Sequence, residues 1–140
     1  MKIIIDSNIL FSALIKNSLT RRMVLDYNGY FLFPSFIFEE MEKHKGELLK
    51  KSKMNAKDFN LLLNLLLRKV MVVPIEALFQ YRKKAYEIIK DVDPDDTIFI
   101  ACALAHPDSV IWSDDKKLKQ QTHVRVINTT EMHKVFYGGR

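Results

Sequence analysis

Short apolar runs recur along the chain, and longer stretches with apolar positions at helical spacing separate them. Each run is rich in β-branched or aromatic residues, which predicts a strand covered on both faces. The predicted strands are residues 2–5, 30–33, 70–73, 110–112 and 125–127. The predicted helices are residues 9–15, 20–27, 35–51, 55–68, 75–90 and 97–105, a short basic helix starting at 113–115, and a last helix after 128. This alternation predicts an α/β fold, a three-layer α/β/α sandwich around a mainly parallel, roughly five-stranded sheet.

Polar residues at the starts of several helices predict how their first turns are capped. Thr20 and Ser35 are expected to cap the second and third helices. Asp93 stands directly before a proline, and proline is favoured at the first helical position. Asn128, followed three residues later by Glu131, predicts a capping box.

The acidic residues fall near the carboxyl ends of the predicted strands. Asp6 follows the first strand, and Glu40 lies in the helix after the second. Asp96 lies in the first turn of the helix before the fourth strand, and Asp114 and Asp115 follow that strand. Ligands of such sheets bind beyond the carboxyl ends of the strands, and the first and fourth strands are neighbours in many doubly wound sheets. We therefore expect these acids to converge.

Carboxylates gathered in this way repel one another unless a cation lies among them. Their hard oxygen atoms favour Mg²⁺ or Mn²⁺, and the sequence has no compact Cys/His spacing of the kind that binds zinc. Divalent ions held by carboxylates can activate a water and stabilise the charge that builds on a phosphodiester, as in many nucleases. Each acid alone also fits a role as a helix cap or partner of a helix dipole, but the four positions together favour a metal site.

Composition and charge agree with this interpretation. The 140 residues are enough for one domain, residues 1–140, and the net charge of +5 favours attraction to a polyanion such as nucleic acid. Cys102 is the only cysteine and lies in an apolar run, so we expect a buried thiol and a reducing, cytoplasmic setting. No stretch approaches the roughly 20 apolar residues of a membrane span, so no membrane association is expected.

Four segments resemble motifs of the PIN domain, the nuclease fold of many prokaryotic toxin ribonucleases, the VapC-like proteins, and of RNA-processing enzymes. They are IIIDSNILFSAL, PSFIFEEMEKH, DPDDTIFIACALA and IWSDDKKL, and the resemblance extends over the whole chain. The chain departs from the pattern at Lys117, where many relatives carry a further acid.

The resemblance implies an Mg²⁺- or Mn²⁺-dependent endoribonuclease with RNA as its substrate. It assigns the catalytic and metal-binding roles to four acids: Asp6, Glu40, Asp96 and Asp115. Supporting polar roles are expected for Asn8, Ser113, Asp93 and Asp114. The candidates for phosphate contacts are Arg21, Arg22 and Lys116. The family also implies a possible antitoxin protein as a partner, and a homodimer.

Three other protein classes share parts of this pattern. A phosphatase of the haloacid dehalogenase type also begins with a strand and an aspartate, but it has Asp-x-Asp where this chain has Asn8 as the third residue. A receiver domain needs an aspartate after its third strand, where this chain has Pro74. A non-catalytic PIN-like module that binds RNA or a protein stays open as an alternative, because Lys117 replaces an acid.

Overall fold

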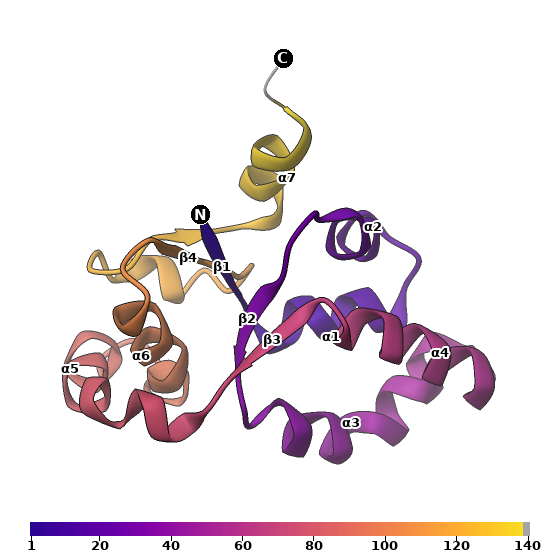
Figure 1. Ribbon diagram of the computed structural model, residues 1–140, viewed down its shortest axis with the longest axis horizontal. Helices are drawn as coiled ribbons and strands as arrows, with labels where there is room; N and C mark the ends of the chain where they lie inside the picture. The colour runs from indigo at the N-terminus through magenta and orange to yellow at the C-terminus, as the bar shows by residue number, and fades with distance from the viewer. Residues whose placement is uncertain (139–140) are drawn as a thin grey trace.

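A parallel five-stranded sheet runs through the centre of the molecule (Figure 1). The computed structural model describes residues 1–138. The strands are β1 (Lys2–Ile5), β2 (Phe31–Pro34), β3 (Val70–Val73), β4 (Ser109–Trp112) and β5 (Val126–Ile127), in the order β3-β2-β1-β4-β5. All pairings are parallel, and Ile3 lies opposite Phe31 on one side and Val110 on the other. The predicted parallel sheet is confirmed, with every strand boundary within one residue of its predicted position.

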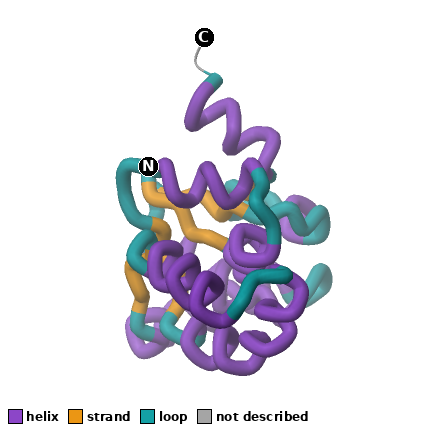
Figure 2. Tube along the Cα trace, turned by 90° about the vertical axis from the view of Figure 1, so that its right-hand side faces the viewer, coloured by secondary structure: helices purple, strands orange, loops and turns teal. Residues whose placement is uncertain are grey.

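Helices cover both faces of the sheet (Figures 1 and 2). One side carries α1 (Ser7–Ile15), α2 (Leu19–Asp26), α3 (Ile37–Ser52) and α4 (Ala56–Leu67), and α7 (Thr129–Tyr137) contacts α2. The other side carries α5 (Phe79–Ile89) and α6 (Thr97–Ala105). Parallel crossovers are right-handed, so the reversal of strand order after β3 places α5 and α6 on the second face. The predicted α/β/α arrangement is confirmed. Within residues 1–138, no helix has the length and apolar character needed to cross a membrane.

The core extends over both faces of the central strands, between them and the two helix layers. Ile3, Ile4 and Ile5 of β1 and Trp112 of β4 have no solvent exposure, as expected for strands that are apolar on both faces. α6 is apolar nearly all round because it is packed between the sheet and α5. Cys102 is buried on this helix, and burial raises the pKa of its thiol to about 12.

Two predicted helix caps are wrong. α2 is capped by Ser18 and not by Thr20, since the Ser18 hydroxyl accepts a hydrogen bond from the Arg21 backbone N–H at 3.3 Å. Ser35 does not cap α3; its hydroxyl accepts from the backbone N–H of Ile75 at 3.1 Å. Ser35 thereby ties the end of β2 to the chain that leaves β3.

Two helices also differ in extent from their predictions. The predicted helix 75–90 begins as a 3-10 turn, η1 (Ile75–Leu78), before α5. The short basic helix expected from 113–115 is reduced to a 3-10 turn, η3 (Leu118–Gln120). The backbone N–H groups of Asp115 and Lys117 are engaged instead by the side chains of Ser113 and Asp115, which hold the segment in a turn.

The capping box at the start of α7 is present as predicted. The Glu131 N–H donates to the Asn128 side chain at 2.8 Å, and the Asn128 N–H donates to the Glu131 carboxylate at 3.0 Å. Farther along α7, Phe136 stacks on Tyr27 with a centroid distance of 5.1 Å. The box and the stacked rings fix α7 at its two ends.

Removal of the capping side chain should therefore destabilise the fold. We expect Asn128→Ala to lower the free energy of unfolding by about 1 kcal/mol, because a helix N–H loses its acceptor. Asn60→Ala is the control, since Asn60 is exposed in the middle of α4, where alanine is tolerated. Urea denaturation monitored by circular dichroism measures both. Equal stability of Asn128→Ala and wild type would contradict the role assigned to the box.

Candidate metal centre

Asp6 lies at the point where the buried strand β1 meets α1. Its backbone N–H donates to the carbonyl of Trp112 in β4 at 3.1 Å, which continues the pairing of the two strands by one residue. The residue is only 7% exposed, which is unusual for an aspartate. The fold thus places a carboxyl group beyond the centre of the sheet and largely out of water.

Ser113 connects Asp6 to Asp115 across the ends of β1 and β4. Its buried hydroxyl donates to Asp6 Oδ2 at 2.6 Å and accepts from the Asp115 N–H at 3.1 Å. Its own N–H donates to the carbonyl of Ile127 at 3.0 Å, which holds the residue against β5. One serine therefore orients the acids that follow two neighbouring strands.

Asp96 approaches this edge from the start of α6. The 3-10 turn η2 (Pro94–Asp96) precedes the helix, and the Asp93 side chain accepts from the Asp95 N–H at 3.1 Å. The predicted cap and proline position are thus both present. In this turn, Asp93 and Asp96 lie on the same side as Asp115 of the β4 end, and each offers a carboxylate oxygen within 4.8 Å of the other two.

The three acids Asp93, Asp96 and Asp115 are half-buried and lie close together. Burial and the negative charges of Asp93 and Asp6 raise the pKa of Asp96 to about 7. The Asp96 Oδ2 atom is buried and, within residues 1–138, has no hydrogen-bond partner. Burial also raises the pKa of Asp6, with the charge of Asp115 adding to the rise and the Ser113 hydrogen bond opposing it. A buried carboxylate oxygen without a donor, among other carboxylates, fits a hard divalent cation.

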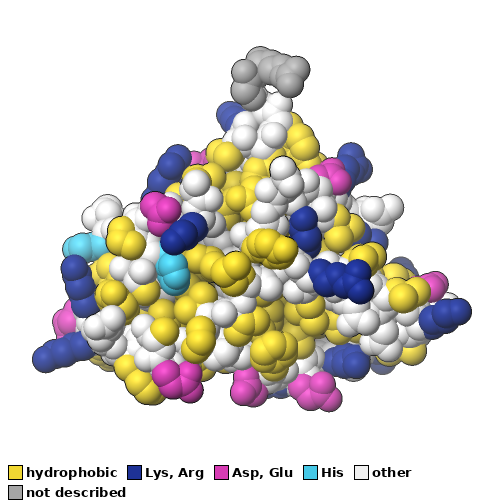
Figure 3. Space-filling model, viewed as in Figure 1, with side chains coloured by type: hydrophobic (Ala, Val, Ile, Leu, Met, Phe, Trp, Pro, Cys, Tyr) yellow, Lys and Arg dark blue, Asp and Glu magenta, His cyan; other side chains and the backbone are white. Residues whose placement is uncertain are grey.

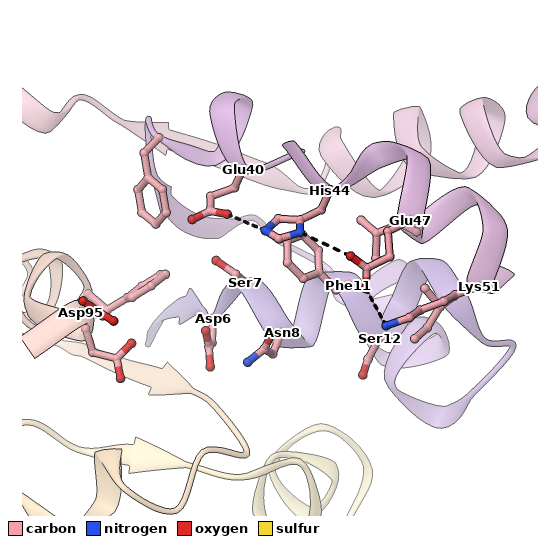
Figure 4. A pocket seen from close by; sticks show the side chains of 15 residues that line it. Asp6, Ser7, Asn8, Phe11, Ser12, Glu40, His44, Glu47, Lys51 and Asp95 are labelled. Carbon is pink, nitrogen blue, oxygen red and sulfur yellow. Dashed lines mark ion pairs between the residues drawn. The ribbon is translucent and has the colours of Figure 1, made fainter. Parts of the chain in front are cut away.

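Glu40 faces the same region from α3. It lines a groove together with Asp6, Asn8 and Asp96, and Figure 4 shows it across the groove from Asp6. Its carboxylate lies 3.3 Å from Nε2 of His44, one helical turn onward. Among the described residues, the compact three-acid group contains neither Glu40 nor Asp6. The metal-binding roles assigned to all four acids, Asp6, Glu40, Asp96 and Asp115, stay predictions.

Of the other predicted site residues, Asp114 is engaged by α7, whereas Asn8 and Lys116 are exposed. The carboxylate of Asp114 points away from the group and accepts from the N–H and hydroxyl of Thr129, both at 2.7 Å, so it fastens the β4 end to α7. Asn8 is exposed on the groove side of α1, and Lys116 is exposed next to Asp115 in sequence. Their functional roles stay predictions.

Arg21 and Arg22 both lie on α2. The Arg21 guanidinium donates to the carbonyls of Ala13 and Leu14 at 2.6 and 3.1 Å, so it caps the end of α1. Arg22 is exposed, and its charge acts on Tyr137 of α7. Neither position adjoins the acid group, and their contacts to phosphate stay predictions.

Sequence reasoning missed part of the groove. Phe11 and His44 line it, with ring centroids 5.3 Å apart. The available signal for His44 was its position four residues after Glu40, which places the two side chains on one face of a helix. The sequence predicts Asp93 as a helix cap and a supporting residue, whereas its carboxylate also lies within 4.8 Å of those of Asp96 and Asp115.

The fold is a parallel α/β sandwich, and carboxyl groups lie at the switch point of its sheet. The protein is therefore an α/β domain with a candidate site for a divalent cation. The chain matches the sequence model of the PIN domain over residues 4–135, and it belongs to the PIN domain family. No curated protein and no solved structure matched it. PIN domains are generally nucleases that use divalent metals, and the acids here form a possible site for one.

The raised pKa of Asp96 predicts how stability depends on pH in the absence of metal. Between about pH 4, where an unfolded aspartate ionises, and about pH 7, the folded chain keeps a proton that the unfolded chain releases. The contribution of Asp96 to the free energy of unfolding should therefore be most favourable below this window, fall as the pH rises through it, and level off above it. Asp96→Asn should remove this contribution.

Denaturant unfolding in EDTA between about pH 4 and about pH 8 measures the effect. Other carboxyl groups also titrate, so the quantity to compare is the stability of Asp96→Asn relative to wild type. As the pH rises, the free energy of unfolding of Asp96→Asn should increase relative to that of wild type. Asp108→Asn, at an exposed aspartate before β4, should show no such trend. A difference that stays constant with pH would contradict the raised pKa.

Proposed function

We propose that this protein is an Mg²⁺- or Mn²⁺-dependent endoribonuclease that hydrolyses phosphodiester bonds of RNA. The observation that carries the proposal is the buried Oδ2 atom of Asp96, which lacks a donor among residues 1–138 and lies in a group of carboxylates. Such an arrangement is costly unless a cation completes it. Membership of the PIN domain family supports nuclease chemistry at this place.

The proposed ligands are the four acids Asp6, Glu40, Asp96 and Asp115. Asp93 is a further candidate, because its carboxylate lies within 4.8 Å of those of Asp96 and Asp115. When bound, a divalent ion would make a water acidic enough to act as the nucleophile and would offset the charge that develops on the phosphate. An all-oxygen ligand set favours Mg²⁺ or Mn²⁺.

The chain's own residues position this chemistry. The Ser113 hydroxyl donates to Asp6 Oδ2 and fixes the orientation of this carboxyl group. The same hydroxyl holds the backbone of Asp115, so the two acids keep a fixed relation when ligands exchange. Asn8, exposed at the groove next to Asp6, is suited to hydrogen-bond a phosphate or sugar of the substrate.

The charge distribution supports a polyanionic substrate. The net charge is +5 although the proposed site is acidic, so the excess positive charge lies elsewhere on the molecule. Lys116 is exposed directly after Asp115 and is the best placed of the predicted phosphate contacts. Arg22 is exposed but lies on α2, and the guanidinium of Arg21 is engaged by α1 carbonyls.

Exposed apolar side chains support a protein partner as part of this proposal. Leu61 and Leu65 on α4 are 57% and 49% exposed. Met71 and Val72 of the edge strand β3 are 52% and 38% exposed, and Figure 3 shows hydrophobic side chains gathered across the middle of the face that it displays. A second copy of the chain or an antitoxin protein could cover such a surface, consistent with the toxin of a toxin–antitoxin pair. A cytoplasmic setting would suit the buried, unpaired Cys102.

The alternative is a non-catalytic PIN-like module that binds RNA or a protein. Lys117 favours it, because this position holds an acid in many relatives. In the structure, the Lys117 backbone N–H donates to Asp115 Oδ1 at 2.9 Å, so the segment is ordered around the aspartate without that acid. Cleavage distinguishes the two functions.

An RNA cleavage assay in Mg²⁺ and in Mn²⁺ tests the proposal. Wild type should cleave RNA only when metal is present, and Asp6→Asn and Asp96→Asn should each lower kcat/KM at least about 100-fold, because each replaces a carboxylate ligand of the proposed metal by a neutral amide. Asp108→Asn is the matched control, since this exposed aspartate precedes β4 at the other end of the strand, and it should cleave like wild type. Full activity of both site variants would exclude the proposed site.

A further inference from the structure

The groove that contains the acids continues between α1 and α3. It has a volume of about 620 Å³, far more than a metal ion with its waters requires. Asp6 and Glu40 lie toward one end of the groove, and Phe11 of α1 lies farther along it (Figure 4). In Figure 4, Phe11 and His44 lie between Glu40 on one side and Glu47 and Lys51 on the other. The proposed metal chemistry involves only the acidic end, and it assigns no role to the second part of the groove, around Phe11.

The second part of the groove combines an aromatic ring with unengaged polar groups. Phe11 is half-buried, and its ring is tilted by 57° against that of His44. Asn8 and Ser12 are exposed one helical turn apart on α1. Within residues 1–138, neither of these two side chains takes part in a hydrogen bond. A flat ligand with polar edges could therefore contact Phe11 with its face and α1 with its edge.

The titratable side chains on this part of the groove contact one another. Glu47 Oε1 lies 2.8 Å from the Lys51 ammonium, and Glu47 Oε2 lies 3.9 Å from His44 Nδ1. His44 also contacts Glu40, so every titratable side chain of the α3 wall has a partner on the same helix. Among the described residues that line this part of the groove, a phosphate would find no unpaired cation. An uncharged, aromatic ligand is the better match.

We propose that this part of the groove, defined by Phe11, Asn8 and Ser12, is a subsite for one unpaired nucleobase of the RNA next to the cleaved phosphate. The inference rests on the proposed ribonuclease function and adds a recognition element to it. Phe11 lies five residues beyond Asp6, about 7 Å along the helix axis, which a nucleotide adjoining the cleaved phosphate can span. Stacking on an aromatic side chain contributes about 1–3 kcal/mol per base.

The subsite requires a base that has left its stack. In an A-form duplex both faces of a base are covered by its neighbours, so Phe11 could not reach one. In a single-stranded region or loop, the base can turn into the groove and present its edge to Asn8 and Ser12. Cleavage should accordingly occur where an unpaired base adjoins the cut.

RNA oligonucleotides with a single abasic nucleotide at successive positions test the subsite. These RNAs are cleaved by the wild-type protein in Mn²⁺. At one position next to the cut, we expect loss of the base to lower kcat/KM about 10-fold, mainly because KM rises. Phe11→Leu should show a similar loss on intact RNA and little further loss on the RNA that lacks this base. Ser12→Leu, at an exposed position, should obstruct the subsite and reproduce the effect without altering the core.

Phe38→Leu is the matched control, because Phe38 is 59% exposed on α3 and does not line the groove. It should cleave every oligonucleotide like wild type. Thermal stabilisation by Mn²⁺ should be the same in Phe11→Leu as in wild type, which separates base recognition from damage to the acids.

Two results overturn the subsite and leave the ribonuclease intact: equal cleavage of all abasic RNAs, or a Phe11→Leu variant that behaves like Phe38→Leu. In either case the groove serves another occupant, such as a protein segment. A wild-type protein that cleaves no RNA with either metal overturns the proposed function and the subsite together.

Discussion

The parallel pairing of β1 with β4 determines where the chemically active groups lie. The chain builds outward from β1 to β2 and β3, then returns across the sheet so that β4 lies on the other side of β1. This return is the switch point at which open α/β sheets bind ligands. Asp6 and Ser113 follow directly from the two paired strands, and their 2.6 Å hydrogen bond exists only because Ile5 lies opposite Trp112. Asp96 reaches the same edge because α6 leads into β4.

The carboxyl groups at this edge are costly to the metal-free fold. Burial and like charges raise the pKa of Asp96 to about 7, so ionisation at neutral pH opposes folding. Burial of the hydrophobic side chains of β1 and β4 stabilises the fold and offsets the cost of this cluster. A bound cation would make the electrostatic contribution of these carboxylates to folding favourable. Metal binding would therefore stabilise the fold through the same acids that the proposed cleavage requires.

Much of the fold follows from local patterns. The β-branched runs placed all five strands, and Asn128 with Glu131 gave the capping box, because both signals depend on residues close in sequence. The caps of α2 and α3 could not be predicted in the same way: the Ser35 hydroxyl bonds to Ile75, which is 40 residues away. At the site, the Ser113 hydroxyl contacts both Asp6 and the backbone of Asp115, while the metal-binding roles of these acids stay predictions. The contact of Phe11 with His44 depends on how α1 packs against α3, which no motif encodes.

The central claim is that the acids at the β1–β4 edge hold a divalent cation. The most direct test is to locate bound Mn²⁺ in crystals of the protein. Anomalous diffraction from crystals grown with Mn²⁺ should place an ion among the carboxylates of Asp6, Asp96 and Asp115, with Asp96 Oδ2 as a ligand. Crystals of Asp96→Asn should lose that ion. Wild-type crystals with these carboxylates free of Mn²⁺, or with the ion bound at another place, would contradict the account.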